Sequence, residues 1–125
     1  MSAVEVLFLV DHAGRVLWSD ASSSPVALPD HRGRWEAIWG HRAELAEIAH
    51  SHPLGPLAFS AEDEATMTAL TDALGRAPVF SVITPEAMLR RQGGRDERVV
   101  DEPWWASLLR RASQAPARRR APPRG

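Results

Sequence analysis

The sequence contains neither cysteine nor lysine. The first absence excludes disulfide bonds, thiolate metal ligands and a cysteine nucleophile, so any bound metal must be held by nitrogen and oxygen. The second leaves no lysine side chain for acylation or isopeptide formation. With 125 residues, of which 44% are hydrophobic and 25% charged, the chain has the size and composition of one small globular domain. Collagen, coiled coil and wholesale disorder do not fit this composition.

Long hydrophobic runs are missing as well. Segment 1–10 has no basic flank, and Glu5 interrupts its short apolar run. We therefore expect neither a secretory signal nor a membrane span, and no membrane partner. A cytoplasmic location is the default expectation.

The charges are unevenly distributed, although the net charge is only -1. All 16 acidic residues lie at or before Glu102, whereas six arginines follow it. We expect residues 111–125, which are mostly Pro, Ala and Arg, to form a disordered basic tail after a single domain at residues 1–110. Such a tail could bind nucleic acid non-specifically, but no aromatic residue interleaves it, so we do not expect a nucleic-acid partner.

Hydrophobic patterning predicts strands that alternate with helices, and hence an α/β domain. Segment 45–50 is ambiguous because Ala and Glu also suit a helix, but the His-Pro that follows favours a buried strand opening into a loop. A helix should begin at Ser60 and stop at Gly75, because both are capping residues. Strands are expected at 4–10, 15–18, 45–50, 79–83, 87–91 and 98–100, and two further helices from Asp30 to about Arg42 and from Pro103 through Leu109.

The candidate site begins with the segment His-Ser-His-Pro at 50–53. In an extended chain, side chains two residues apart point to the same face, so His50 and His52 can present both imidazoles to one ion. Pro53 ends the strand and Gly55 allows a sharp bend, so the loop can return the next helix toward the histidines.

Asp63, in the first turn of that helix, could then supply an oxygen ligand. Two His and one carboxylate leave a fourth position for water, which is the composition of a catalytic zinc site. Each of the two motifs also has a non-functional explanation. A His-x-His segment usually lies on the protein surface without binding a metal, and Ser60 with Asp63 has the spacing of a helix cap. The joint pattern would arise on the order of once in ten thousand shuffled chains, which favours a functional origin.

These residues resemble the signature of the JAB/MPN/JAMM metalloproteases. That signature is an upstream Glu, then His-(Ser/Thr)-His-Pro, a Ser after seven intervening residues, and an Asp three positions further on; the match is complete from His50 to Asp63. The resemblance implies one JAB/MPN-type core, a cytidine deaminase-like mixed sheet flanked by helices. It also implies a Zn²⁺ ion held by His50, His52 and Asp63 with one water, and Ser60 donating a hydrogen bond to the tetrahedral oxyanion.

The family's general base is a Glu on or beside the first core strand, and Glu5 fits that place. Glu36 falls on the expected helix before the site, and Glu44 and Glu47 lie close to the histidines in sequence, which makes them alternatives of weaker fit. Glu5 can otherwise be read as a solvated charge at a strand edge.

The resemblance implies a zinc peptidase or isopeptidase that hydrolyses an amide bond at the C-terminal tail of a ubiquitin-like or sulfur-carrier protein. The alternative is a non-catalytic scaffold of the same fold, since the family also contains inactive members. Trp104 and Trp105 cannot both face inward on one helix, so one of them is available for a protein partner or a second copy of the chain. We expect Trp18, Trp35 and Trp39 to pack in the core or at its rim, and His12, His31 and His41 to be isolated and exposed.

Overall fold

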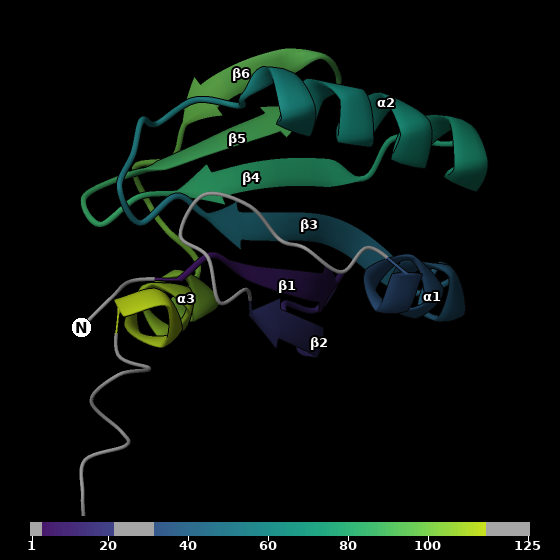
Figure 1. The fold of residues 1–125 in the computed structure, drawn as a ribbon, viewed down its shortest axis with the longest axis horizontal. Coiled ribbons are helices and arrows are strands. Elements are labelled where there is room, and N and C mark those ends of the chain that lie inside the picture. The colour runs from purple at the N-terminus through teal and green to yellow at the C-terminus, as the bar shows by residue number, and fades with distance from the viewer. Residues whose placement is uncertain (1–3, 22–31, 115–125) are drawn as a thin grey trace, which may run out of the picture.

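The computed structural model describes residues 4–21 and 32–114. This part of the chain has an α/β fold, with a six-stranded mixed sheet and three helices (Figure 1). The predicted fold class is confirmed at this level. In chain order the elements are β1 (Val6–Asp11), β2 (Val16–Ala21), α1 (Arg32–Gly40), β3 (Leu45–Ser51), α2 (Ala61–Leu74), β4 (Val79–Ile83), β5 (Met88–Gln92), β6 (Arg95–Arg98) and α3 (Trp104–Gln114).

The strands are arranged in the order β2-β1-β3-β4-β5-β6, which Figure 1 shows from bottom to top. β3 and β4 run parallel and are connected through α2, whereas the other neighbouring pairs are antiparallel. Ligands of open α/β sheets bind beyond the carboxyl ends of strands. The loop from β3 to α2 starts at such an end, and it carries the His-Ser-His-Pro segment.

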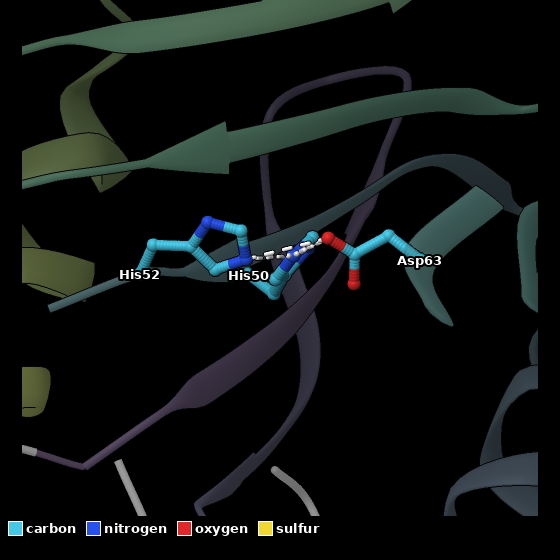
Figure 2. Close-up of side chains that lie close together, drawn as sticks. All are labelled: His50, His52 and Asp63. Atoms are coloured by element: carbon cyan, nitrogen blue, oxygen red, sulfur yellow. Dashed lines mark hydrogen bonds and ion pairs between the residues drawn. The ribbon is translucent and has the colours of Figure 1, made fainter. Parts of the chain in front are cut away.

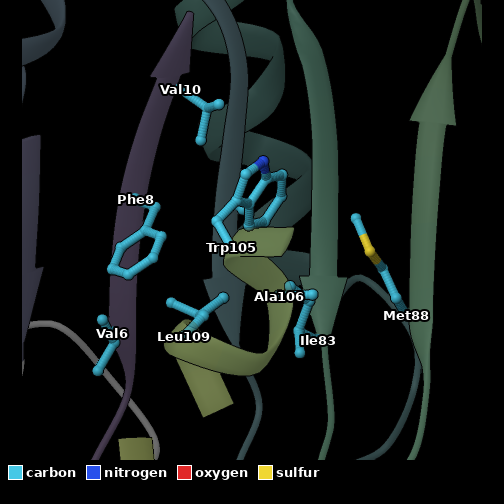
Figure 3. Close-up of a cluster of buried hydrophobic side chains, with 9 residues drawn as sticks. Val6, Phe8, Val10, Ile83, Met88, Trp105, Ala106 and Leu109 are labelled. Atoms are coloured by element: carbon cyan, nitrogen blue, oxygen red, sulfur yellow. The ribbon is translucent and has the colours of Figure 1, made fainter. Parts of the chain in front are cut away.

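Helices cover both faces of the sheet. On one face, Trp105 and Leu109 project from α3 onto β1 and its neighbours, in a core cluster that Figure 3 shows. On the other face, Ile38 of α1 and Met67 and Leu70 of α2 pack on a second cluster formed by alternate residues of the central strands. Period-two alternation along β1 supplies both clusters, because successive side chains of a strand point to opposite faces.

The capping predictions for α2 are confirmed. Ser60 is the N-cap of α2 and forms a full capping box with Asp63, and Gly75 ends the helix with a φ of 75°. Segment 45–51 is a strand, as favoured. Trp105 is buried at 1% exposure while Trp104 is 62% exposed, so only one of the pair faces inward.

The last strand was predicted wrongly at 98–100; it is β6, from Arg95 to Arg98. The reason is the turn at Gly93 and Gly94, whose positive φ values of 60° and 77° close a two-residue hairpin that pairs Gln92 with Arg95. This register starts the strand directly after the turn and leaves Val100 94% exposed. β6 is an edge strand of charged residues, which hydrophobic patterning does not detect.

The carboxyl end of the domain also differs from the prediction. α3 continues to Gln114, past the expected boundary at residue 110. Its last turn is attached to the start of the chain, because the Val4 N–H donates to the Ser113 carbonyl at 2.9 Å and the Ser113 hydroxyl donates to the Val4 carbonyl. The tail at 115–125 and the helix cap expected at Asp30 lie outside the described residues. None of the helices described is long and apolar enough to span a membrane.

Candidate metal centre

The carboxyl end of β3 presents His50 and His52. The two rings lie edge to face, with 4.8 Å between their centroids. The backbone N–H of His52 donates to the carbonyl of Ile83 at 2.8 Å, which extends the pairing with β4 past the last residue of β3. Between the histidines, Ser51 faces the other side of the sheet, where its Oγ accepts from the Val6 N–H at 2.9 Å. Both imidazoles therefore share one face, as predicted.

Asp63 reaches the histidines from the first turn of α2. Its backbone N–H donates to Ser60 Oγ at 3.0 Å, and its Oδ2 accepts from the Ser60 N–H at 2.8 Å. This reciprocal capping fixes the carboxylate. The same Oδ2 lies 3.3 Å from Nε2 of His50 and 3.3 Å from Nε2 of His52, as Figure 2 shows. One interaction thus caps the helix and aims a carboxylate oxygen at both rings.

The spacing of the three donor atoms fits a tetrahedral metal ion. Nε2 of His50 and Nε2 of His52 are 3.1 Å apart, and each is 3.3 Å from the Asp63 oxygen. Zinc binds imidazole nitrogen and carboxylate oxygen at about 2.0–2.2 Å, and a tetrahedron of that size has edges of about 3.3 Å. The three atoms therefore form one face of such a tetrahedron. We call His50, His52 and Asp63 the metal-ligand group.

Nδ1 of His52 lies 3.0 Å from the carbonyl of Pro56. A carbonyl accepts only, so Nδ1 carries the hydrogen, and in the neutral ring the Nε2 lone pair is left for a metal ion held between the three ligand atoms. The bend that brings Pro56 back is made at Gly55, which has a φ of 76° and donates its N–H to the His52 carbonyl at 3.0 Å. The predicted role of Gly55 in turning the loop is confirmed.

Hydrogen bonds within the group shift the pKa values of Asp63 and His52. Burial by itself would raise the pKa of Asp63, but hydrogen bonds from His50 and His52 outweigh it and hold that pKa well below its usual range. Burial opposes protonation of His52, but its hydrogen bonds to Asp63 and Pro56 prevail and raise its pKa. Protons and a metal ion therefore compete for the same atoms, because a ligand imidazole must be neutral.

Glu5 stands directly before β1 and faces the metal-ligand group. Leu7 of β1 lies opposite His50, and the same antiparallel register continued by two residues places Glu5 beside His52. Both valines that flank Glu5 pack on the α3 face, so Glu5 points to the other face, where it lines the same pocket as the histidines. The predicted general base is thus brought to the site.

Burial raises the pKa of the Glu5 carboxyl. The charges of His50 and His52 act against this shift, that of Asp63 adds to it, and Arg34 lowers it again. A carboxylate with a raised pKa holds a proton more readily than a solvated one. Glu5 is also half-buried in the pocket beside the histidines, so it is not a solvated charge at a strand edge.

The other candidate bases lie elsewhere. Glu47 is buried on the opposite face of β3 from the histidines, where it accepts from Ser81 Oγ at 2.8 Å and from two nitrogens of Arg90 at 3.1 Å each. Glu36 on α1 and Glu44 before β3 are exposed. None of these three glutamates lines the pocket beside the metal-ligand group.

The pocket has a volume of about 700 Å³ and lies between α1 and α2. Its floor is the sheet, and the pocket is also lined by Arg34 of α1 and Thr66 of α2. The metal-ligand group lies at the end where β3 meets the first turn of α2. Ser60, expected to stabilise an oxyanion, is exposed and lines this end. Its Oγ accepts from the Asp63 N–H, which leaves the hydroxyl hydrogen available for donation into the pocket.

Arg91 forms a second feature of the site, a set of ion pairs at the start of α2 that no sequence motif indicated. From β5, Arg91 donates to both carboxylate oxygens of Glu64, at 2.6 and 2.9 Å, and also to Asp96. Its guanidinium lies 4.7 Å from the ring centroid of Phe59, and that ring in turn contacts His50. Glu64 directly follows the aspartate of the metal-ligand group. Arg91 thus connects the start of α2 to strand β5 on the same face of the sheet.

We expect Arg91→Ala to weaken the binding of a divalent ion about tenfold, because the first turn of α2 loses its attachment. The measurement is a Zn²⁺ titration of the metal-free protein by calorimetry. Arg90→Ala is the matched control, because it breaks the bidentate ion pair of Arg90 with Glu47, which lies on the same strand but on the opposite face of the sheet. The control should destabilise the fold more, since Glu47 is buried, yet keep its metal affinity. Equal losses of affinity in both variants would contradict this role of Arg91.

The remaining histidines do not join the group. His12 is exposed, as predicted, whereas His41 is half-buried and lies 3.7 Å from Glu44 at the amino end of β3. His31 falls outside the described residues. Within the described part of the chain, His50, His52 and Asp63 form the one cluster of three potential ligands.

Comparison with known proteins adds no assignment: no family model matches the chain, and no curated protein matches it. The chemistry of the site is therefore inferred from its donor atoms and their surroundings.

Proposed function

We propose that this chain is a zinc-dependent amide hydrolase, a peptidase or isopeptidase of the JAB/MPN type. The observation that carries the proposal is the spacing of 3.1–3.3 Å between the two imidazole nitrogens and the Asp63 oxygen, at the mouth of a pocket that also contains a half-buried glutamate. A structural zinc site normally has four protein ligands, whereas three ligands with an open position are typical of a catalytic one.

Each residue has a defined task in this mechanism. A zinc ion in the site would polarise the scissile carbonyl and lower the pKa of a water molecule. Glu5 accepts a proton from the attacking water and passes it to the leaving amine, and its raised pKa suits both transfers. His52 is kept in the metal-binding tautomer by the Pro56 carbonyl. Ser60 donates its hydroxyl hydrogen to the oxygen that becomes negative in the transition state.

The proposed substrate is an amide at the C-terminal tail of a ubiquitin-like or sulfur-carrier protein. An extended tail can reach a metal centre at a sheet end by lying along neighbouring backbone. The six-stranded mixed sheet with helices on both faces agrees with the core that the resemblance implies. The alternative, a non-catalytic scaffold, gives no reason for two imidazoles, a carboxylate and a half-buried glutamate to converge.

Zinc content and hydrolysis together test the proposal. Protein purified without chelator should contain about one zinc per chain. It should also cleave an amide fusion behind a Gly-Gly tail, and lose that activity with a chelator and regain it with Zn²⁺. Metal far below one equivalent, with no binding on titration, would contradict the hydrolase and favour the scaffold.

Ser60→Ala should reduce kcat about a hundred- to a thousandfold, because one oxyanion donor is lost. It should also destabilise the protein by about 1 kcal/mol, since the N-cap of α2 is lost. Ser60→Asp is the matched comparison, because it restores a capping oxygen without a hydroxyl donor. Steady-state kinetics and thermal unfolding separate the two roles. Recovery of kcat together with stability in Ser60→Asp would show that capping alone explains the serine.

A further inference from the structure

The pocket continues away from the metal-ligand group over an apolar floor. Leu7, Ile48 and Phe80 form that floor on three adjacent strands. Ile48 lies two residues before His50 on the same face of β3, so the floor begins about 7 Å along the strand from the first ligand. The walls come from α1 and α2: Ile38, Met67 and Leu70 are apolar, and Arg34 and Thr66 add polar groups.

The mouth of the pocket carries exposed apolar side chains. Trp35 of α1 is 37% exposed and Leu54 of the loop after β3 is 72% exposed, and both line the pocket. They are two of the five large hydrophobic residues that are exposed within the described ranges. Apolar surface that is left in water beside a cavity marks a binding site more often than isolated exposure does.

We propose that this pocket is a specificity pocket that takes a large apolar side chain of the substrate, next to the amide that is cut. That the ligand is a substrate rests on the hydrolase function proposed above. A volume of about 700 Å³ lies within the range of small-molecule sites, and glycine has no side chain to enter it. The apolar residues of the floor and walls are buried at 3–7% exposure, so the apolar surface open to water is that of Trp35 and Leu54, and a Gly-Gly segment has no side chain to cover it. The preferred amide therefore has leucine, phenylalanine or a similar residue beside the scissile bond.

Binding to the metal-free protein tests the pocket without requiring catalysis. N-acetyl-leucinamide and N-acetyl-glycinamide are matched probes that differ in one apolar side chain, and NMR titration measures both affinities. We expect the leucine probe to bind about ten- to a hundredfold more tightly, since burying such a side chain has an effect of that size. The leucine probe should also shift resonances of Leu7, Ile48 and Phe80.

Two substitutions on α2 provide the matched control. Thr66 and Thr68 are both exposed on α2, but only Thr66 lines the pocket. Thr66→Trp should fill the pocket and abolish the preference for leucine, and Thr68→Trp should leave it unchanged. Thermal unfolding checks that both variants are folded.

Equal affinities for the two probes, or a preference that survives Thr66→Trp in a folded protein, would overturn the specificity pocket. Neither result depends on zinc or on hydrolysis. The pocket can therefore fail while the hydrolase stands, and the hydrolase can fail while the pocket binds apolar amides.

Discussion

Asp63→Asn is expected to lower the affinity for Zn²⁺ by more than about a hundredfold, because it removes a charged ligand of the metal itself rather than a supporting contact. Asparagine retains an oxygen that can accept from the Ser60 N–H, so the helix cap is largely preserved. Loss of metal should therefore not be accompanied by loss of the fold. Calorimetric titration with Zn²⁺ and circular dichroism measure the two properties.

Glu62→Gln is the control for this substitution. Glu62 is the neighbouring carboxylate, is exposed and lines the same pocket, but it is not part of the metal-ligand group. It should keep its zinc affinity within about twofold, since an exposed charge is screened. Unchanged zinc binding in Asp63→Asn would contradict the metal centre, and with it the hydrolase.

Glu5→Gln is expected to abolish measurable turnover while zinc binding survives. General bases contribute about a hundred- to ten-thousandfold to rate. The alternative bases, Glu36, Glu44 and Glu47, do not line the pocket. Glu36→Gln on the exposed face of α1 is the control and should remain active. Turnover that persists in Glu5→Gln would mean that the base is another group.

The same substitution should stabilise the metal-free protein at neutral pH. Burial raises the pKa of Glu5 above its unfolded value of 4.5, so the folded state binds the proton more tightly. Its contribution to stability is then fully present below pH 4.5 and is lost as the pH rises through the folded pKa. Gln has no such charge to bury. Thermal unfolding across this pH range should show a higher Tm for Glu5→Gln at neutral pH and little difference below 4.5; equal Tm values at neutral pH would contradict the burial of the Glu5 charge.

A stability gain with a loss of activity is the pattern expected of a catalytic residue. Functional groups are held in surroundings that are unfavourable to their charge, and removing them relieves that cost. A carboxylate that served only as a surface charge would change neither property.

Local sequence patterns were enough to predict much of the candidate metal centre. His50 and His52 share a face because strand side chains alternate, and Asp63 is fixed by a capping box that spans four residues. Both effects act between near neighbours, so they can be read from the chain directly. The end of α2 at Gly75 has the same origin.

The register set by a turn and the contacts between distant segments could not be predicted in this way. The last strand lies closer to the turn at Gly93 and Gly94 than hydrophobic patterning predicted, because the geometry of the turn sets the register of the hairpin. The ion pair of Arg91 with Glu64 joins β5 to the start of α2 across 27 positions of sequence. No periodicity in the sequence indicates that Arg91 and Glu64 are partners.

The sequence by itself determined which residue types could bind a metal and that two histidines and an aspartate would lie near one another. Only the tertiary structure decided which glutamate faces them: the pairing of β1 with β3 places Glu5 on their side of the sheet, while Glu47 is turned to the other face. The apolar pocket likewise exists only where α1 and α2 meet the same three strands. Alternation along a strand gives the face of a residue, but its neighbours across the sheet are set by strand pairing and helix packing.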